Sequence, residues 1–278
     1  MIFGMKFDNS IFVKTKAILF VLVALIGFAL FAFYPGKEEA TPLEYKVINV
    51  QGNILYVQTG NEMKRGDTYL EGTTLNFETK DSRAAIMNKS VGRMVLTGND
   101  KGKIRILPAQ NNNSSRSGAL LNLIDLKSHF SGRYLILDKT EVEISSPDYK
   151  MDDQNFFYIR YDFMDESIPK RLDNDGNKLI LDKNQIFRID GEPIPTFETE
   201  MTLYYSKEGN NTKISKFTPV FPDLEALKEE LTLMFSVFEF KDEEAKYNEV
   251  KAHLNEFYGT PHDDDLKTWM NQEFDTNY

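Results

Sequence analysis

The chain has 278 residues, of which 41% are hydrophobic, and carries a formal net charge of −10. This acidic balance argues against nucleic acid as a partner, because binding to phosphates requires a surplus of lysine and arginine. The chain contains no cysteine, which excludes disulfides and thioether-linked lipids, so an exported domain would depend on its hydrophobic core alone.

An uncharged segment at residues 17–34 predicts one N-terminal transmembrane helix. Its 18 residues, at about 1.5 Å of rise each, come close to the ~30 Å hydrocarbon thickness of a bilayer. A cleaved signal peptide is the alternative, but bulky residues stand where a peptidase requires small ones, which favours an uncleaved anchor. The predicted anchor residues are Ala17, Phe20, Leu22, Leu25, Phe28, Phe31, Phe33 and Tyr34.

The charges on either side of this segment predict its orientation. Three lysines precede it, and the part that follows has 30 basic and 42 acidic residues. By the positive-inside rule, residues 1–16 form a cytoplasmic tail and the chain is exported from residue 35 onward. We therefore expect an inner (cytoplasmic) membrane protein with a periplasmic ectodomain. Its N-terminal helix contacts the lipid bilayer, and residues 35–42 form a hydrated tether.

Residues 43–108 consist of short alternating apolar and polar runs separated by glycines. Such a pattern predicts a small antiparallel β domain in which the glycines supply turn conformations. The glycines at the gaps are Gly52, Gly60, Gly66, Gly72, Gly92, Gly98 and Gly102.

Two motifs in this domain, VQGNI at residues 50–54 and MKRGDTYLEGTTL at residues 63–75, look like the FecR-type periplasmic β domain. The segments SRAAI at 82–86 and GRMVL at 92–96 extend the resemblance to about a quarter of the chain. The resemblance implies a periplasmic β module of a regulator that signals through a sigma factor. FecR-type regulators place a sizeable cytoplasmic domain before the helix, whereas residues 1–16 are too few to bury a core. The β module is therefore expected to serve assembly.

The rest of the chain predicts a linker at residues 109–118 and, at residues 119–238, a second antiparallel β module with helices, so that the fold is mainly β with two tandem modules. Residues 119–130 suggest a short helix, and the stretch from 133 to 221 returns to strand character. Alternation places Phe157, Ile159, Tyr161 and Phe163 on one face, which is either core or a docking surface for a partner. Residues 223–238 have helical spacing and are expected to cover the second sheet.

Residues 239–278 predict an acidic helical tail. From residue 223 to the end there are 15 acidic and 5 basic residues, so partners with basic surfaces are expected. The tail also contains the only tryptophan, which makes it a candidate binding element. Its candidate contact residues are Leu266, Trp269, Met270 and Phe274.

No motif in the sequence indicates catalysis, a metal or a cofactor. The three histidines lie apart from any nucleophile motif, and no phosphate-binding glycine loop occurs. Asp173–Gly176 imitates part of a calcium loop, but Arg171 would hold its first ligand position, so a hairpin turn is expected. His262 before three aspartates could bind a metal weakly, although an acidic helix start explains the same residues. We expect no enzyme and no cofactor.

Three functions are compatible with these features. The first is a scaffold subunit of a multiprotein envelope complex, such as a type VI-like secretion system, with other cell-envelope proteins as its partners in a multi-copy assembly. The second is a FecR-like relay that acts on a sigma factor. The third is an envelope hydrolase, which would need carboxylates that converge in a cleft.

Overall fold

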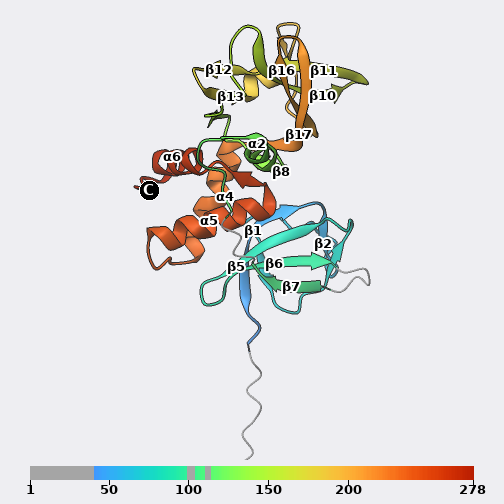
Figure 1. Cartoon of the computed structure of the whole chain (residues 1–278). Coiled ribbons are helices and arrows are strands. Elements are labelled where there is room, and N and C mark those ends of the chain that lie inside the picture. Colours follow the sequence, from blue (N-terminus) through green and yellow to red (C-terminus); the bar gives the residue numbers. More distant parts are fainter. Residues whose placement is uncertain (1–40, 99–103, 110–113) are drawn as a thin grey trace, which may run out of the picture. The chain divides into compact units, whose positions relative to one another are not determined.

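The first β module forms a five-stranded antiparallel sheet in the order β3-β1-β5-β6-β7, beside a small β2-β4 pair (Figure 1). The computed structural model describes residues 41–98, 104–109 and 114–278, and Leu43–Tyr278 forms one packed unit. The strands are β1 (Glu44–Gln51), β2 (Ile54–Tyr56), β3 (Thr68–Leu70), β4 (Leu75–Phe77), β5 (Arg83–Asn88), β6 (Gly92–Gly98) and β7 (Ile104–Pro108).

Five of the seven glycines predicted at turns have a positive φ, namely Gly52, Gly60, Gly66, Gly72 and Gly92. Gly98 instead lies in β6, and Gly102 lies outside the described residues. Gly66 and Gly72 have φ angles of +88° and +86°, a region that glycine enters without steric cost. Gly52 also has a positive φ, and a Cβ there would lie 2.4 Å from the Ser82 hydroxyl oxygen. A larger residue at position 52 would therefore both strain the turn and displace the start of β5.

Both faces of this sheet are buried. On β1, Val47 belongs to a core inside the module, whereas the next residue, Ile48, packs against C-terminal helices. The near-continuous apolar run of β5 has the same cause, since Ala84 and Ile86 face the inner core and Ala85 faces the helices.

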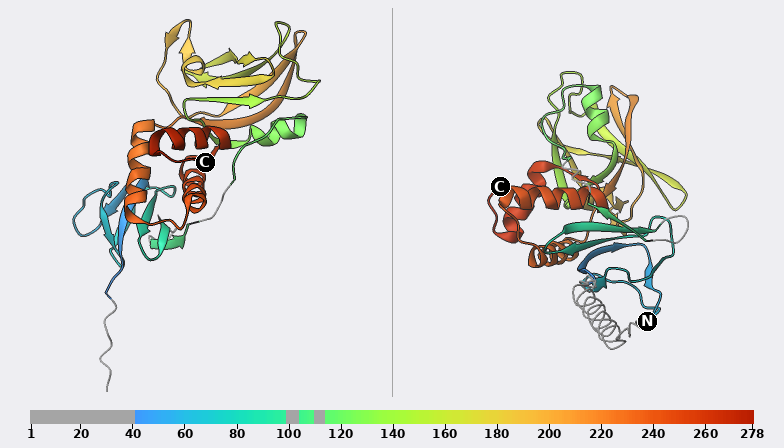
Figure 2. Two further views of the ribbon diagram at one scale, coloured as in Figure 1. Left: turned by 90° about the vertical axis from the view of Figure 1, so that its left-hand side faces the viewer. Right: turned by 90° about the horizontal axis from the view of Figure 1, so that it is seen from below.

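The second module contains a six-stranded sheet in the order β11-β10-β16-β17-β8-β18 and a three-stranded sheet, β12-β13-β9. Figure 2 shows these strands from two further sides. Its elements are α2 (Leu123–His129), β8 (Gly132–Leu135), β9 (Lys139–Glu143), β10 (Asn155–Phe163), β11 (Glu166–Arg171), β12 (Asp173–Asp175), β13 (Lys178–Asp182), α3 (Lys183–Ile186), β14 (Arg188–Ile189), β15 (Glu192–Pro193), β16 (Met201–Lys207), β17 (Asn210–Val220) and β18 (Thr260–Pro261).

The second module is mostly antiparallel, as predicted, but two of its strand pairs depart from that prediction. Strand β8 pairs in parallel with both β17 and β18. Parallel neighbours require a long crossover, and here the chain passes through helices before it returns as β18. Alternation of apolar residues reports which face a residue occupies, but it carries no information about strand direction.

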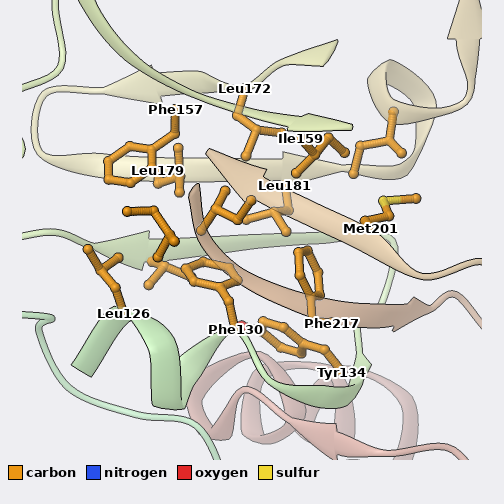
Figure 3. Close-up of a cluster of buried hydrophobic side chains, with 14 of the residues drawn as sticks. Leu126, Phe130, Tyr134, Phe157, Ile159, Leu172, Leu179, Leu181, Met201 and Phe217 are labelled. Atoms are coloured by element: carbon orange, nitrogen blue, oxygen red, sulfur yellow. The ribbon is translucent and has the colours of Figure 1, made fainter. Parts of the chain in front are cut away.

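The docking alternative for the aromatic face of β10 is wrong for three of its four residues. Phe157, Ile159 and Tyr161 are at most 2% exposed and lie in the main core of the second module. Figure 3 shows Phe157 and Ile159 within this core. Phe163 is partly buried and packs against the same core. The Tyr161 hydroxyl donates a hydrogen bond to the Ile186 carbonyl at 2.7 Å, which satisfies its polar end inside the core.

Three C-terminal helices, α4 (Leu224–Val237), α5 (Glu243–Phe257) and α6 (Asp263–Phe274), form what is called here the helical layer. Helix α4 begins as predicted, with the Asp223 side chain accepting a hydrogen bond from the Ala226 amide at 3.0 Å. The predicted position of α4 over the second sheet is wrong, because Leu227 and Leu231 pack with Ile48 and Ala85 of the first module.

The acidic tail is part of this layer and not a separate binding element. Leu266, Trp269 and Met270 are at most 7% exposed and belong to the same core as Ile48. Phe274 is partly buried against that core. These four side chains hold the helical layer together, so they are not offered to a partner.

No helix in the ranges 41–98, 104–109 and 114–278 is long and apolar enough to cross a membrane. The predicted cytoplasmic tail, the predicted anchor at 17–34 and most of the predicted tether lie outside these ranges.

Candidate functional site

A buried ion cluster joins the first module to the helical layer. Arg93 on β6 is 5% exposed, and its Nε and Nη1 donate to Glu249 Oε1 and Glu256 Oε2, both at 2.6 Å. The two glutamates are seven residues apart on α5, which is two helical turns, so both face the same strand. One arginine thus fixes the position of α5 on the sheet.

A second polar cluster lies at the same junction, around the buried carboxylate of Glu230 on α4. Asn49 on β1 donates to Glu230 Oε1 at 3.0 Å, and the Tyr258 hydroxyl donates to Oε2 at 2.8 Å. His253, which is fully buried on α5, completes the cluster through its Nε2. Burial and the Glu230 charge raise the pKa of Tyr258, so this hydroxyl remains a donor.

The first module is the basic partner of the acidic helices. Residues 43–108 contain 10 basic and 7 acidic residues, against 5 basic and 15 acidic from residue 223 onward. Besides the Arg93 cluster, Arg65 donates to Glu229 at 2.8 Å and to the Ala226 carbonyl at 2.6 Å. Part of the acidic surplus that was expected to attract a separate protein is therefore satisfied within the chain.

Residues 114–118 are the described end of the predicted linker, and hydrogen bonds of Arg116 hold them in place. Arg116 is 9% exposed, and its guanidinium donates to carbonyl oxygens that include those of His129 and, at 2.6 Å, Ser131. The guanidinium carbon also lies 4.4 Å from the centre of the Tyr134 ring. The Arg116 amide donates to the Pro261 carbonyl at 2.9 Å, which ties this segment to the start of α6. The described end of the predicted linker is therefore packed against the rest of the chain.

The protein is expected to lose stability as the pH falls from about 6.5 towards 3 because of His129. Burial, together with the charges of Arg116 and His262, lowers the pKa of His129 to about 3. Between these pH values the unfolded chain binds a proton that the folded chain does not, so folding becomes less favourable by up to about 1.4 kcal/mol per pH unit. Thermal unfolding of the wild type and of His129→Gln at pH 7.5 and pH 5.0 measures this. The variant should show a smaller difference between the two pH values, and an equal difference would contradict the prediction.

A cleft of about 640 Å³ opens beside the junction. Arg83 at the start of β5 donates from Nε to Gln51 Oε1 at 2.9 Å, and its guanidinium lies 5.0 Å from the centre of the Phe257 ring. Arg133 on β8 forms an ion pair with Glu198 and donates to the Tyr258 carbonyl at 3.3 Å. The residues that line the cleft are Gln51, Lys80, Asp81, Ser82, Arg83, Thr97, Arg133 and Glu198.

The calcium-like segment is a hairpin, as expected. Asp173 to Asp175 form β12, which pairs with β13 through a turn at Gly176, where φ is +57°. The aspartates after His262 form the acidic first turn of α6, where Asp263 accepts from Tyr247 and from Lys251. Among the described residues, no group of three or more potential metal ligands is present.

The arginines that build the junction and the cleft were not predicted. Arg83 directly precedes the apolar residues 84–87, and Arg93 lies within the run from Val91 to Leu96. An unexplained cation beside or within such a run is a signal that a carboxylate or an anion faces the strand.

No family model, curated protein or solved structure matches the chain. The resemblance of residues 43–108 to the FecR-type domain stays a prediction.

Proposed function

We propose that the chain is a periplasmic scaffold subunit, anchored in the inner membrane, of a multiprotein envelope complex such as a type VI-like secretion system. The observation that supports this most is the junction at Arg93, where buried ion pairs join the first β module to the helical layer. Buried ion pairs often add little net stability, and in some proteins they specify one relative arrangement of the elements they join, which is the role proposed for this junction. A protein that positions partners needs such a fixed arrangement.

The ends of the sheets supply candidate contact points for these partners. Strands β7 and β11 end their sheets, and an edge strand offers backbone groups for pairing with another chain. Leu107 on β7 is 46% exposed, and Met164, between β10 and β11, is 82% exposed. Apolar side chains at an edge favour a protein partner over solvent.

Purification of the tagged full-length protein from its native membrane in mild detergent, followed by mass spectrometry, tests the proposal. Several envelope proteins recovered in a fixed ratio are expected. A Glu249→Gln, Glu256→Gln double variant, which takes both carboxylates from Arg93, should reduce their recovery several-fold, whereas Lys139→Gln on the surface should not. Recovery of a sigma factor would favour the FecR-like relay, and recovery of an isolated monomer would contradict the scaffold.

A further inference from the structure

We infer that the cleft between Arg83 and Arg133 is a binding site for a carboxylate on an acidic segment of a partner protein. The inference rests on the proposed scaffold function, because it names a chemical feature of one partner. It uses residues of both β modules, since Arg83 lies on the first sheet and Arg133 on the second.

Arg83 has donor capacity that the described part of the chain does not use. Its Nε is occupied by Gln51, and its ring contact is with Phe257, but neither terminal amino group has an acceptor among the described residues. The guanidinium is half-buried and lines the cleft. A planar guanidinium with two unused parallel N–H groups matches the two oxygens of a carboxylate.

The second arginine shows that this cleft already holds a carboxylate. Arg133 pairs with Glu198, and both side chains are nearly half exposed, at 43% and 48%. Glu198 lies in the segment between β15 and β16, outside any strand or helix. An exposed ion pair of this kind contributes little to stability. A carboxylate from a partner can therefore replace Glu198 beside Arg133 with only a small loss of free energy.

The two cations also lie close enough to interact unfavourably. Burial lowers the pKa of Arg83, and the positive charge of Arg133 lowers it further against the opposing effects of Glu256 and Asp81. A bound anion would relieve this repulsion and would be stabilised by both charges at once.

The charge of the whole chain favours a protein segment over a polyanion. With a net charge of −10, the protein repels extended polyanions such as nucleic acids and acidic polysaccharides. A partner surface that is otherwise uncharged or basic is not repelled in this way. One or two carboxylates on such a surface can still bind the two arginines. Thr97 in the lining supplies a hydroxyl that suits a peptide backbone.

The experiment is fluorescence anisotropy of the full-length protein in mild detergent at low salt. The probe is a labelled, end-capped hexapeptide with two adjacent glutamates, compared with the same peptide carrying glutamines and with an oligomer of glucuronate. The glutamate peptide should bind, the glutamine peptide should bind at least about tenfold more weakly, and added salt should weaken binding. Equal binding of the two peptides, or stronger binding of the glucuronate oligomer, would overturn the inference.

Variants assign the binding to the cleft. Arg83→Gln should weaken binding of the glutamate peptide about tenfold, whereas Lys139→Gln, the same charge change on β9 outside the cleft lining, should not. Glu198→Gln should strengthen binding several-fold because it removes the internal competitor, and Glu200→Gln two residues away is its matched control. A gain of affinity cannot arise from misfolding, so an unchanged Glu198→Gln variant would count against the inference even if Arg83→Gln folds poorly.

The purification experiment separates this inference from the proposed function. If Arg83→Gln recovers the same envelope proteins as the wild type, the cleft is not their contact and the inference fails while the scaffold stands. If the wild-type protein recovers no envelope proteins, the scaffold proposal fails, whether or not the glutamate peptide binds.

Discussion

Replacing Phe157 with alanine is expected to lower the free energy of unfolding by about 3 to 5 kcal/mol. Its ring is fully buried in the core of the second module, with the Tyr205 ring centre 4.9 Å away and Tyr149 at 5.9 Å. Removal of the ring takes away its burial and leaves a cavity that its neighbours fill only in part. Urea unfolding of the full-length protein in mild detergent, followed by near-ultraviolet circular dichroism, measures the loss.

Ile124→Ala is the matched control for this prediction. Ile124 lies on α2 of the same module but is 78% exposed, so its truncation should change the free energy of unfolding by less than about 0.5 kcal/mol. If Phe157→Ala costs no more than Ile124→Ala, the ring is not a core residue, and the docking interpretation of the β10 face would be restored.

The β10 face shows what alternation in a sequence can and cannot predict. Alternation correctly placed Phe157, Ile159 and Tyr161 on one face, because side chains of a strand point to opposite sides in turn. Whether a second layer covers that face depends on elements such as β9 and β13, which contribute Val142 and Leu179 to the same core. That coverage is a property of the tertiary fold, and local periodicity does not contain it.

Helix α4 shows the same limit at the level of whole elements. Its cap at Asp223 and its apolar stripe were both readable, since they depend on neighbouring residues. The stripe fits any apolar surface of suitable shape, so the sequence did not specify which sheet it would meet. The first sheet was available because β5 is apolar on both faces, a pattern that indicates a covering layer on each side.

The junction and the cleft were beyond prediction because their partners are distant in the chain. Arg93 meets Glu249 across 156 residues, and Asn49 meets Glu230 across 181. Residue type alone gave 43 acidic and 33 basic residues from which to choose pairs. The position of Arg93 inside an apolar run, and that of Arg83 directly before one, could have marked them as unusual. Only the fold assigns Glu249 and Glu256 to Arg93 and leaves Arg83 facing a cleft.

Replacing Arg93 with methionine is expected to lower the free energy of unfolding by about 3 kcal/mol. The Arg93 side chain is 0% exposed, and its removal would leave two carboxylates, 22% and 17% exposed, facing each other without a cation. Repulsion between them acts directly at the contact between β6 and α5. Tryptophan fluorescence during urea unfolding of the full-length protein reports on this, since Trp269 is the only tryptophan and lies in the helical layer.

Two further variants show whether the loss arises from the uncompensated charges. Arg65→Met removes a cation from a pair whose glutamate is 72% exposed, and it should cost less than about 1 kcal/mol. The triple variant Arg93→Met, Glu249→Gln, Glu256→Gln should recover much of the stability lost by Arg93→Met, because no charge is then left unpaired at the junction. If the triple variant is no more stable than Arg93→Met, the loss does not arise from the uncompensated carboxylates. If the triple variant recovers part of the loss but stays well below the wild type, the ion pairs themselves stabilise the attachment of α5, and their role exceeds the specification of geometry on which the scaffold proposal depends.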